Sequence, residues 1–344
     1  MRIFGLFFAS IVLILAAIWS TIGQERNPAI YQAVRHLDKI ASSVPEPETV
    51  YFVGDIMLAR DVERRLSARE SDYAFGNLDF LKDAAAVIGN FEAAIPEVHE
   101  PTPNMVMRFS VPASLLPVLS AGGVTHVSLA NNHALDFGEE GYHHTRDELE
   151  TLGLGVVGHP TRIDDDSVAY IEVGGKVIAV LGVNATYGGV SDDWTDVLET
   201  SSMQSDVQIV YIHWGEEYQP WHSESQEELA RLFVDTGADI VIGHHPHVVQ
   251  DIESYKNGLI FYSLGNFIFD QYWNDDVSEG LMLELVLGGK DPHVSLLPVE
   301  SKTERVRPRL MSVDERTAFL EGLSKRSSAM LAEDIMRGAI PLQF

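Results

Sequence analysis

The sequence predicts an α/β fold in which helices cover a β-sheet. Six short apolar, β-branched segments each run into polar residues, the first at 49–55 and the last at 258–266. Helix-like stretches lie between several of them, at 138–152 and 223–236. Fully apolar strands that alternate with helices are typical of sheets covered on both faces.

Residues 1–48 precede this pattern. Residues 3–23 are apolar or small and uncharged, and one helix needs about 20 such residues to cross a bilayer. We expect residues 1–23 to be a membrane anchor, which would make this a single-pass protein of the cell membrane with its main domain outside the cytoplasm. A cleaved signal peptide, giving a secreted or periplasmic protein, is the alternative. Residues 24–48 end in "VPEPE" and predict an extended linker.

The strand pattern begins at residue 49. The six predicted strands and the polar residues that end them occupy 49–55, 84–92, 124–133, 207–215, 238–245 and 258–266. Two further apolar segments, 167–183 and 280–289, predict hairpin or edge strands. We therefore place one domain at 49–300 and a C-terminal helical tail at 301–344.

The chain is acidic and has no cysteine. Lys plus Arg number 24 and Asp plus Glu number 51, so the formal net charge is −27. Such a surface disfavours nucleic acid as a partner, and it would repel an anionic polymer unless the site is locally positive or holds a cation. The absence of cysteine excludes disulfides, thiolate zinc sites and cysteine nucleophiles.

Side chains that can bind metals or transfer protons follow the predicted strands. They are Asp55; Asn90 and Glu92; Asn132, His133 and Asp136; His213, Glu216 and Glu217; His244, His245 and His247; and Asn266 and Asp270. Binding sites form at the carboxyl ends of strands in open α/β sheets, because loops converge there. Imidazole together with carboxylate and amide oxygen, without thiolate, predicts one or two divalent ions such as Mn, Zn, Fe or Mg.

Each of these residues also has a structural interpretation. His213 could be a buried histidine with its hydrogen bonds satisfied, and Asp136 could cap the helix that begins near residue 138. Glu216 and Glu217 could lie on a solvated loop, or could act as the paired carboxylates of a carbohydrate-active enzyme. The three histidines of "HHPH", residues 244–247, fit a structural role least well, because burying imidazoles without partners is costly.

Six segments resemble, in order, the signature blocks of a known family. They are "VGDIMLAR", "IGNFEAAI", "SLANNHALDFGEEG", "YIHWGEEYQ", "IGHHPHVVQ" and "FYSLGNFIFDQ". In these blocks the chain is similar to the CapA family of capsule biosynthesis, the poly-γ-glutamate synthesis accessory proteins grouped with calcineurin-like metallophosphoesterases. The resemblance implies a four-layer α/β/β/α sandwich of metallophosphoesterase type, with metals at the strand ends.

The resemblance also implies roles for single residues. His133 would be the catalytic acid or the phosphate-orienting group. The implied metal ligands are Asp55, Glu92, Asn132, His213, His245 and His247. The remaining residues, which would contact the substrate or support the metal ligands, are Arg60, Asn90, His244 and Asn266. Arg60 is expected either to supply positive charge for an anion or to be a solvated helix residue. Met57 stands where the family motif has a histidine ligand, so one metal position is expected to lack a ligand.

Two functions follow as expectations. The first is a metal-dependent hydrolase or transferase at the cell surface that acts on an anionic polymer or a phosphoester. The second is a non-catalytic accessory subunit for poly-γ-glutamate synthesis or export, working beside synthase subunits at the cytoplasmic membrane.

Overall fold

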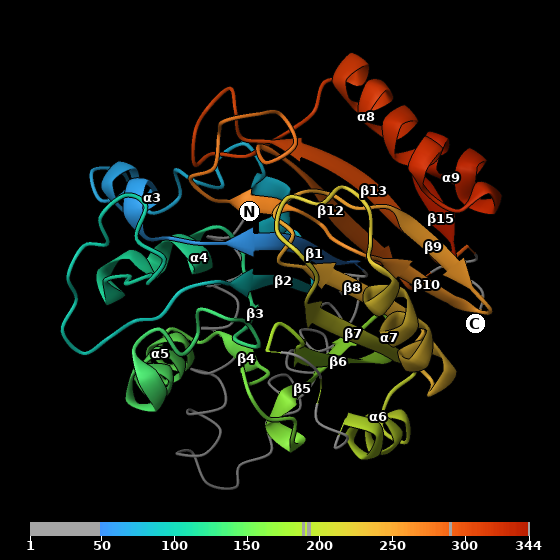
Figure 1. Cartoon of the computed structure of the whole chain (residues 1–344), viewed down its shortest axis with the longest axis horizontal. Coiled ribbons are helices and arrows are strands. Elements are labelled where there is room, and N and C mark those ends of the chain that lie inside the picture. Colours follow the sequence, from blue (N-terminus) through green and yellow to red (C-terminus); the bar gives the residue numbers. More distant parts are fainter. Residues whose placement is uncertain (1–48, 188–189, 191–193, 289–290, 343–344) are drawn as a thin grey trace, which may run out of the picture. The chain divides into compact units, whose positions relative to one another are not determined.

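The computed structural model describes residues 49–344 except 188–189, 191–193, 289–290 and 343–344 (Figure 1). The expected anchor at 1–23 and the linker at 24–48 lie outside the described residues. Within the described ranges, no helix combines the length and the apolar character that crossing a bilayer requires.

The first sheet carries the N-terminal strand at its centre. Its main path runs β14-β13-β12-β1-β2-β3-β4, with β11 paired to β1 and β15 paired to β13. The strands are β1 (Thr49–Ile56), β2 (Ala86–Phe91), β3 (His126–Ser128), β4 (Gly155–Val157), β11 (Asn266–Ile268), β12 (Glu279–Val286), β13 (His293–Glu300), β14 (Arg309–Leu310) and β15 (Ala339–Pro341). Because β1 to β4 are parallel, their carboxyl ends lie at one edge.

The second sheet has the order β5-β6-β7-β8-β10-β9. Its strands are β5 (Val168–Val173), β6 (Lys176–Asn184), β7 (Val207–His213), β8 (Ile240–His244), β9 (Ile252–Tyr255) and β10 (Gly258–Phe261). The expected hairpin at 167–183 is present as the antiparallel pair β5–β6. Strands β6, β7, β8 and β10 are parallel, so this sheet also gathers its carboxyl ends at one edge.

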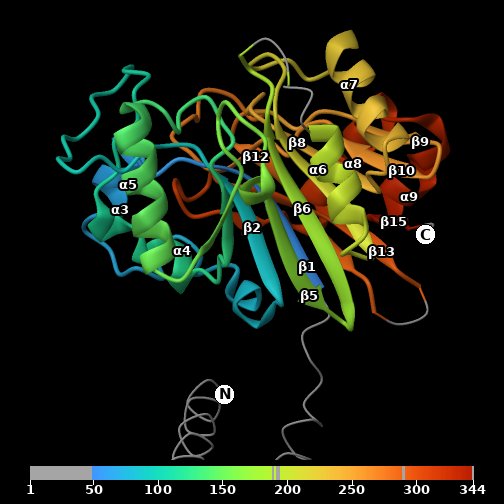
Figure 2. The ribbon, with the colours of Figure 1, turned by 90° about the horizontal axis from the view of Figure 1, so that it is seen from below.

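Helices cover the outer face of each sheet. Figure 2 shows one group beside the first sheet, α3 (Arg60–Leu66), α4 (Pro117–Ala121) and α5 (Gly138–Thr151), and another beside the second sheet, α6 (Trp194–Ser202) and α7 (Glu224–Asp235). Short 3-10 turns complete the connections: η1 (Asp79–Asp83), η2 (Ala113–Leu115), η3 (Asp165–Ser167) and η4 (Ala329–Leu331).

Strand alternation divides the apolar side chains among three clusters. In β1, Val50 and Phe52 face the second sheet, whereas Tyr51 and Val53 join the cluster under α3, α4 and α5. Successive side chains of a strand point to opposite faces, so a fully apolar strand is buried on both sides. The prediction of a mixed α/β fold with two sheets is confirmed.

The C-terminal residues contribute to the core between the sheets. They form α8 (Val313–Arg326) and α9 (Ala332–Arg337), and β15 pairs antiparallel with β13. Ser312 and Glu315 form a capping box that fixes the start of α8. Leu320, Leu323 and Ile335 are buried in the same cluster as the inner faces of both sheets. The described part of the expected tail, residues 301–342, is therefore integrated with the domain that we predicted at 49–300.

One predicted strand is wrong in its extent. Residues 258–266 were expected to be one strand ending at Asn266, but β10 ends at Phe261 in the second sheet and Asn266 begins β11 in the first. The chain crosses between the sheets at Gly265, whose φ of 67° suits glycine. A Cβ atom on Gly54 would lie 1.8 Å from the Gly265 carbonyl oxygen, so glycine at 54 permits this close approach.

Candidate metal centre

The strand register brings the predicted site residues to one level. In the first sheet Asp55 is the register partner of both Asn90 and Asn266, and in the second sheet His213 is the partner of His244. The Tyr211 hydroxyl donates a hydrogen bond to the Val53 carbonyl and so ties the second sheet to β1. The carboxyl ends of both sheets therefore meet at a single buried site.

Two carboxylates, Asp55 and Glu92, lie at the centre of the site and are fully buried. The Asn90 side-chain amide donates to Asp55 Oδ1 at 2.8 Å and approaches Glu92 Oε2 at 3.4 Å. Burial raises the pKa of Glu92 well above its usual value, and the charge of Asp55 adds to this effect. A neighbouring cation would favour the ionised form of Glu92. The two carboxylates, Asp55 and Glu92, are therefore electrostatically suited to bind a cation.

Asp55 behaves differently because its partners are imidazoles. Burial alone would raise its pKa, but the hydrogen bond and charge of His247, the charge of His244 and the bond from Asn90 outweigh burial and lower it. The His247 Nδ1 atom lies 3.1 Å from Asp55 Oδ2 and 3.0 Å from Asn266 Oδ1. Since both neighbours are acceptors, Nδ1 carries the proton and Nε2 keeps its lone pair.

The lone pair of His247 faces an unsatisfied carboxylate oxygen. Its Nε2 atom lies 3.7 Å from Glu92 Oε1, and Nε2 of His133 lies 3.8 Å from the same oxygen. Glu92 Oε1 has no hydrogen-bond partner among the described residues. These separations are too long for hydrogen bonds. Atoms that share one ion at about 2.0–2.2 Å each lie roughly 3–4 Å apart, so the spacing fits a metal.

His213 and His244 line the side of the site that belongs to the second sheet. His213 Nε2 lies 2.8 Å from Asn132 Oδ1, and its Nδ1 lies 2.8 Å from Nδ1 of His244. Burial lowers the pKa of His213 well below its usual value and that of His244 to about 4. Both imidazoles are therefore neutral near pH 7, the state in which they bind metals.

His245 and His247 hold unusual backbone conformations. Their φ angles are 100° and 58°, although neither residue is glycine. Such conformations cost about 1–3 kcal/mol each and persist where the surrounding structure requires them. The His245 amide approaches Asp55 Oδ2 at 3.3 Å, and its buried Nδ1 atom has no hydrogen-bond partner. Burial lowers the pKa of His245 to about 4, so this imidazole is also neutral.

The described residues supply three overlapping sets of ligands, each with its donor atoms within 4.8 Å of one another. The sets are Asp55, His213 and His244; Glu92, His213 and His245; and Asp55, Glu92 and His247. Asn132 Oδ1 lies beside His213 and would add an amide ligand. This mixture of imidazole and oxygen donors fits one or two divalent ions.

His133 is held at the edge of this constellation by Asp136. Its Nδ1 atom lies 2.9 Å from Asp136 Oδ2, and its ring stacks on Phe109 at 4.0 Å. The alternative interpretation of Asp136, as a cap of the following helix, is wrong, because α5 begins after Phe137 without a side-chain cap. The carboxylate also accepts a hydrogen bond from the Phe109 amide, which fixes it for the imidazole.

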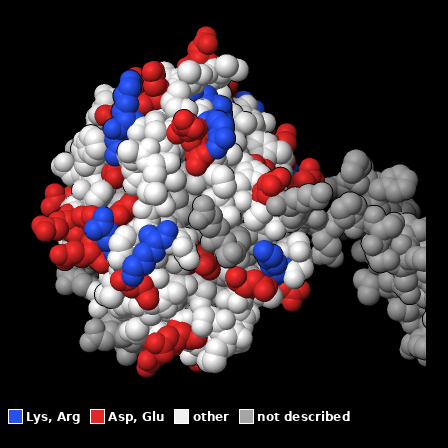
Figure 3. Space-filling model, turned by 90° about the vertical axis from the view of Figure 1, so that its right-hand side faces the viewer, with Lys and Arg blue, Asp and Glu red and all other residues white. Residues whose placement is uncertain are grey.

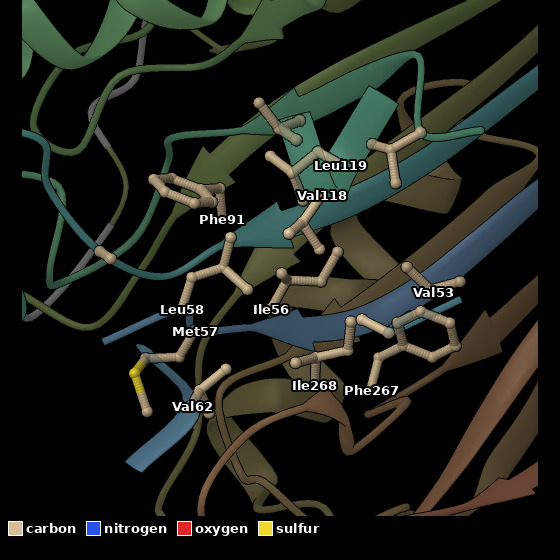
Figure 4. Packing of buried hydrophobic residues seen from close by; sticks show 14 of the residues in the cluster. Val53, Ile56, Met57, Leu58, Val62, Phe91, Val118, Leu119, Phe267 and Ile268 are labelled. Carbon is tan, nitrogen blue, oxygen red and sulfur yellow. The ribbon is translucent and has the colours of Figure 1, made fainter. Parts of the chain in front are cut away.

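The structure also revises three interpretations of single residues. Arg60 is not a solvated helix charge, because it is ion-paired with Asp270 and its side chain is 8% exposed. His244 is fully buried, which argues against direct substrate contact. Met57 is a core residue, since its side chain is buried in the apolar cluster beside Val62 (Figure 4). Residue 57 of this chain therefore belongs to the apolar core, which accounts for a methionine at this position instead of a histidine.

Sequence reasoning missed two contributors to the site. Asn131 donates to Asn90 Oδ1 and to the Phe91 carbonyl, and so fixes the Asn90 amide toward the carboxylates. Glu217 was listed among the polar residues after the strands but was given no role in the site, and its charge helps raise the pKa of Glu92. In the sequence, the only indication for Asn131 and Glu217 was that both lie next to polar residues predicted to form the site.

The fold and site define a two-sheet α/β protein whose converging strand ends hold a buried histidine–carboxylate constellation suited to divalent metals. Residues 49–271 match the family described as bacterial capsule synthesis protein PGA_cap. The chain belongs to this family.

Two relatives agree with this assignment. The capsule biosynthesis protein CapA of Bacillus anthracis is 30% identical, with 96% of this chain and 81% of the relative covered. The PGA biosynthesis protein CapA of Bacillus subtilis (strain 168) is 31% identical over 76% of this chain and 70% of the relative. A solved phosphatase structure from Mycoplasma pneumoniae overlaps 76% of this chain and 92% of that chain at 13% identity and a TM-score of 0.44, too weak a likeness to define the fold.

Proposed function

We propose that this chain is a metal-dependent hydrolase or transferase of capsule biosynthesis, acting on poly-γ-glutamate or on a phosphoester at the cell membrane. The observation that carries the proposal is the convergence of His133 Nε2 and His247 Nε2 on the unsatisfied Glu92 Oε1. The proposal includes an N-terminal anchor at 1–23, a four-layer metallophosphoesterase-type domain and neighbouring synthase subunits.

The chain's own residues can be assigned parts in such a reaction. When bound, a divalent ion supplies Lewis-acid activation of the scissile group and of water. Glu92, His213, His245 and His247 would hold it, with Asp55 and Asn132 completing the set. Asp55 and Asn266 keep the proton of His247 on Nδ1, which leaves Nε2 free as a ligand.

His133 is the proposed acid or orienting group. Asp136 holds its Nδ1–H, so Nε2 is the atom that meets a reacting oxygen. The stack on Phe109 fixes the ring plane, and Phe109 also lies against the Arg60 guanidinium at 4.5 Å. Arg60 places a positive charge near the constellation, where it lowers the pKa of Glu92 against the raising effects of burial and Asp55.

A non-catalytic accessory subunit is the second candidate. It is favoured by the apolar position of Met57, which supplies no ligand, and by the depth of the site. A chain of this kind would bind metal and polymer beside synthase subunits without cleaving a bond.

Activity assays separate the two candidates. The full-length chain is treated with chelator, reconstituted with Mn or Zn, and assayed on phosphodiesters and on γ-glutamyl polymers. The proposed enzyme shows metal-dependent turnover that falls about 100-fold in His133→Asn, since a general acid contributes about that much. Metal binding without turnover on any of these substrates would favour the accessory subunit.

A further inference from the structure

One cavity among the described residues is basic, although the chain as a whole is acidic. It has a volume of about 320 Å³ and is lined by Arg64, Arg65, Arg69, Arg305 and Tyr73. The formal net charge of the chain is −27, and acidic side chains are scattered over the face drawn in Figure 3. Four arginines around one hollow are therefore an exception to the general charge distribution.

Two of the four guanidinium groups have no carboxylate partner among the described residues. Arg69 lies over the Tyr73 ring at 4.7 Å, and Arg305 lies over the Tyr272 ring at 4.8 Å. Neither forms an ion pair with a described residue. An aromatic ring holds a guanidinium in place and leaves its N–H donors available. Both side chains belong to exposed residues, so a ligand from solvent can reach them.

The other two arginines share one carboxylate. Arg64 and Arg65 both pair with Asp61, whose side chain is 13% exposed. A guanidinium has five N–H donors, so one shared carboxylate leaves donors on both arginines. Glu70 and Asp72 are exposed in the same loop, but neither lines the cavity. The lining thus keeps an excess of positive charge.

Backbone strain marks the segment that supplies Arg305. Val306 lines the cavity with a φ of 61°, a conformation that β-branched residues rarely adopt. Its amide donates to the Tyr272 hydroxyl at 3.1 Å. The strained turn therefore holds Arg305 against the ring of Tyr272, in the cavity that Arg64, Arg65 and Arg69 also line.

Helix α3 connects the cavity to the surroundings of the metal centre. Arg60 begins this helix and is ion-paired with Asp270, and the Asp61 amide approaches the same carboxylate at 3.4 Å. Arg64 follows Arg60 by four residues, about one helical turn or roughly 6 Å of rise. Arg60, which lies over the Phe109 ring, and Arg64, which lines the cavity, are therefore positioned by the same helix.

We propose that this cavity is a subsite for successive carboxylates of an anionic polymer, γ-linked polyglutamate in the terms of the proposed function, on which this inference rests. The guanidinium groups contact three separate residues: Arg69 lies over Tyr73, Arg305 lies over Tyr272, and Arg64 and Arg65 pair with Asp61. Guanidinium groups held by separate residues are suited to bind several negative charges that are spaced along a polymer. A single phosphate would instead require donors that converge on one point.

The test measures binding of a defined γ-glutamyl oligomer to the full-length, metal-loaded chain by titration calorimetry. The variant Arg69→Gln/Arg305→Gln removes the two unpaired guanidinium groups. Lys325→Gln/Arg337→Gln removes the same charge from exposed positions of α8 and α9 and is the matched control. We expect the cavity variant to bind at least about tenfold more weakly, since hydrogen bonds to charged groups contribute about 1.5–3 kcal/mol. The control is expected to bind as the unmodified chain does.

Metal content, measured on the same samples, separates this inference from the proposed function and reports on folding. Equal oligomer binding by both variants would overturn the subsite while leaving the metal centre intact. If the unmodified chain holds metal but does not bind the oligomer, the polymer assignment fails for both proposals. Tighter binding of inorganic phosphate or of anionic lipid vesicles, lost in the cavity variant, would overturn the polycarboxylate in favour of a phosphate group.

Discussion

Asp55 and His247 form the hydrogen bond on which the candidate metal centre depends. The Nδ1 atom of the imidazole lies 3.1 Å from Oδ2 of the carboxylate, and both residues are buried. Asp55 belongs to β1 of the first sheet and His247 to the loop that follows β8 of the second sheet, 192 positions further along the chain. The bond fixes the tautomer that turns Nε2 of His247 toward Glu92.

Asp55→Asn tests this bond directly. The substitution removes the charge that favours Nδ1–H, and we expect metal affinity to fall about 10- to 100-fold. Titration of the chelator-treated protein with Mn or Zn measures the change. Asp166→Asn, at a largely exposed carboxylate, should leave affinity unchanged; an unchanged affinity in Asp55→Asn would show that Asp55 has no such role.

Glu92→Gln should stabilise the metal-free protein at neutral pH. The pKa of Glu92 is raised by burial, so the folded state keeps a proton that the unfolded state loses above pH 4.5. The free energy of unfolding therefore decreases as the pH rises above 4.5. The variant Glu92→Gln has no carboxyl proton to lose, so this decrease is absent. We expect a higher free energy of unfolding without metal and a much smaller stabilisation by added metal. Thermal unfolding at pH 7.5 with and without metal measures both; a lower melting temperature of the metal-free variant would contradict the account.

The buried histidines should make the metal-free protein sensitive to acid. The pKa values of His244 and His245 are lowered by burial to about 4, from 6.5 in the unfolded chain. Between these values the unfolded state binds more protons, so stability falls as pH drops from 6.5 toward 4. We expect a loss on the order of 3 kcal/mol or more, measured by chemical denaturation across this range. His244→Ala/His245→Ala should flatten the dependence, and an equally steep curve in this variant would place its cause elsewhere.

Asp136→Asn should impair catalysis without releasing metal. It weakens the restraint on His133 Nδ1 while keeping an acceptor for the Phe109 amide. We expect turnover to fall about 10- to 100-fold at unchanged metal content. Asp147→Asn, on the exposed side of α5, is the control. Equal turnover in both variants would remove Asp136 from the site.

Leu323→Ala should destabilise the whole domain. Leu323 in α8 is fully buried in an apolar cluster that includes residues of both sheets, whereas Val313 in the same helix is 80% exposed. We expect Leu323→Ala to cost about 2–5 kcal/mol and Val313→Ala close to nothing, both by denaturant unfolding with one transition. A separate, early transition for α8 and α9 would show that residues 301–344 fold apart from the core.

The sequence was informative where local pattern determines structure. Apolar runs predicted β1, β2, β7 and β8, and the polar residues after them predicted a common site, because parallel strands gather their carboxyl ends. Pattern could not show that Asn266 starts a strand in the other sheet, since this depends on the turn at Gly265. It also could not show that Asp136 restrains His133 or that Arg60 is buried, because both facts depend on partners distant in the chain.

Metal content is the measurement that tests the central claim most directly. Plasma mass spectrometry on the full-length chain compares the unmodified protein with His245→Ala/His247→Ala. His143→Ala/His293→Ala, at histidines outside the site, is the matched control. We expect one or two equivalents of a divalent metal in the unmodified protein and in the control. In the site variant we expect that metal to be lost. No metal in the unmodified protein after reconstitution with Mn and Zn, or equal metal in all three, would contradict it.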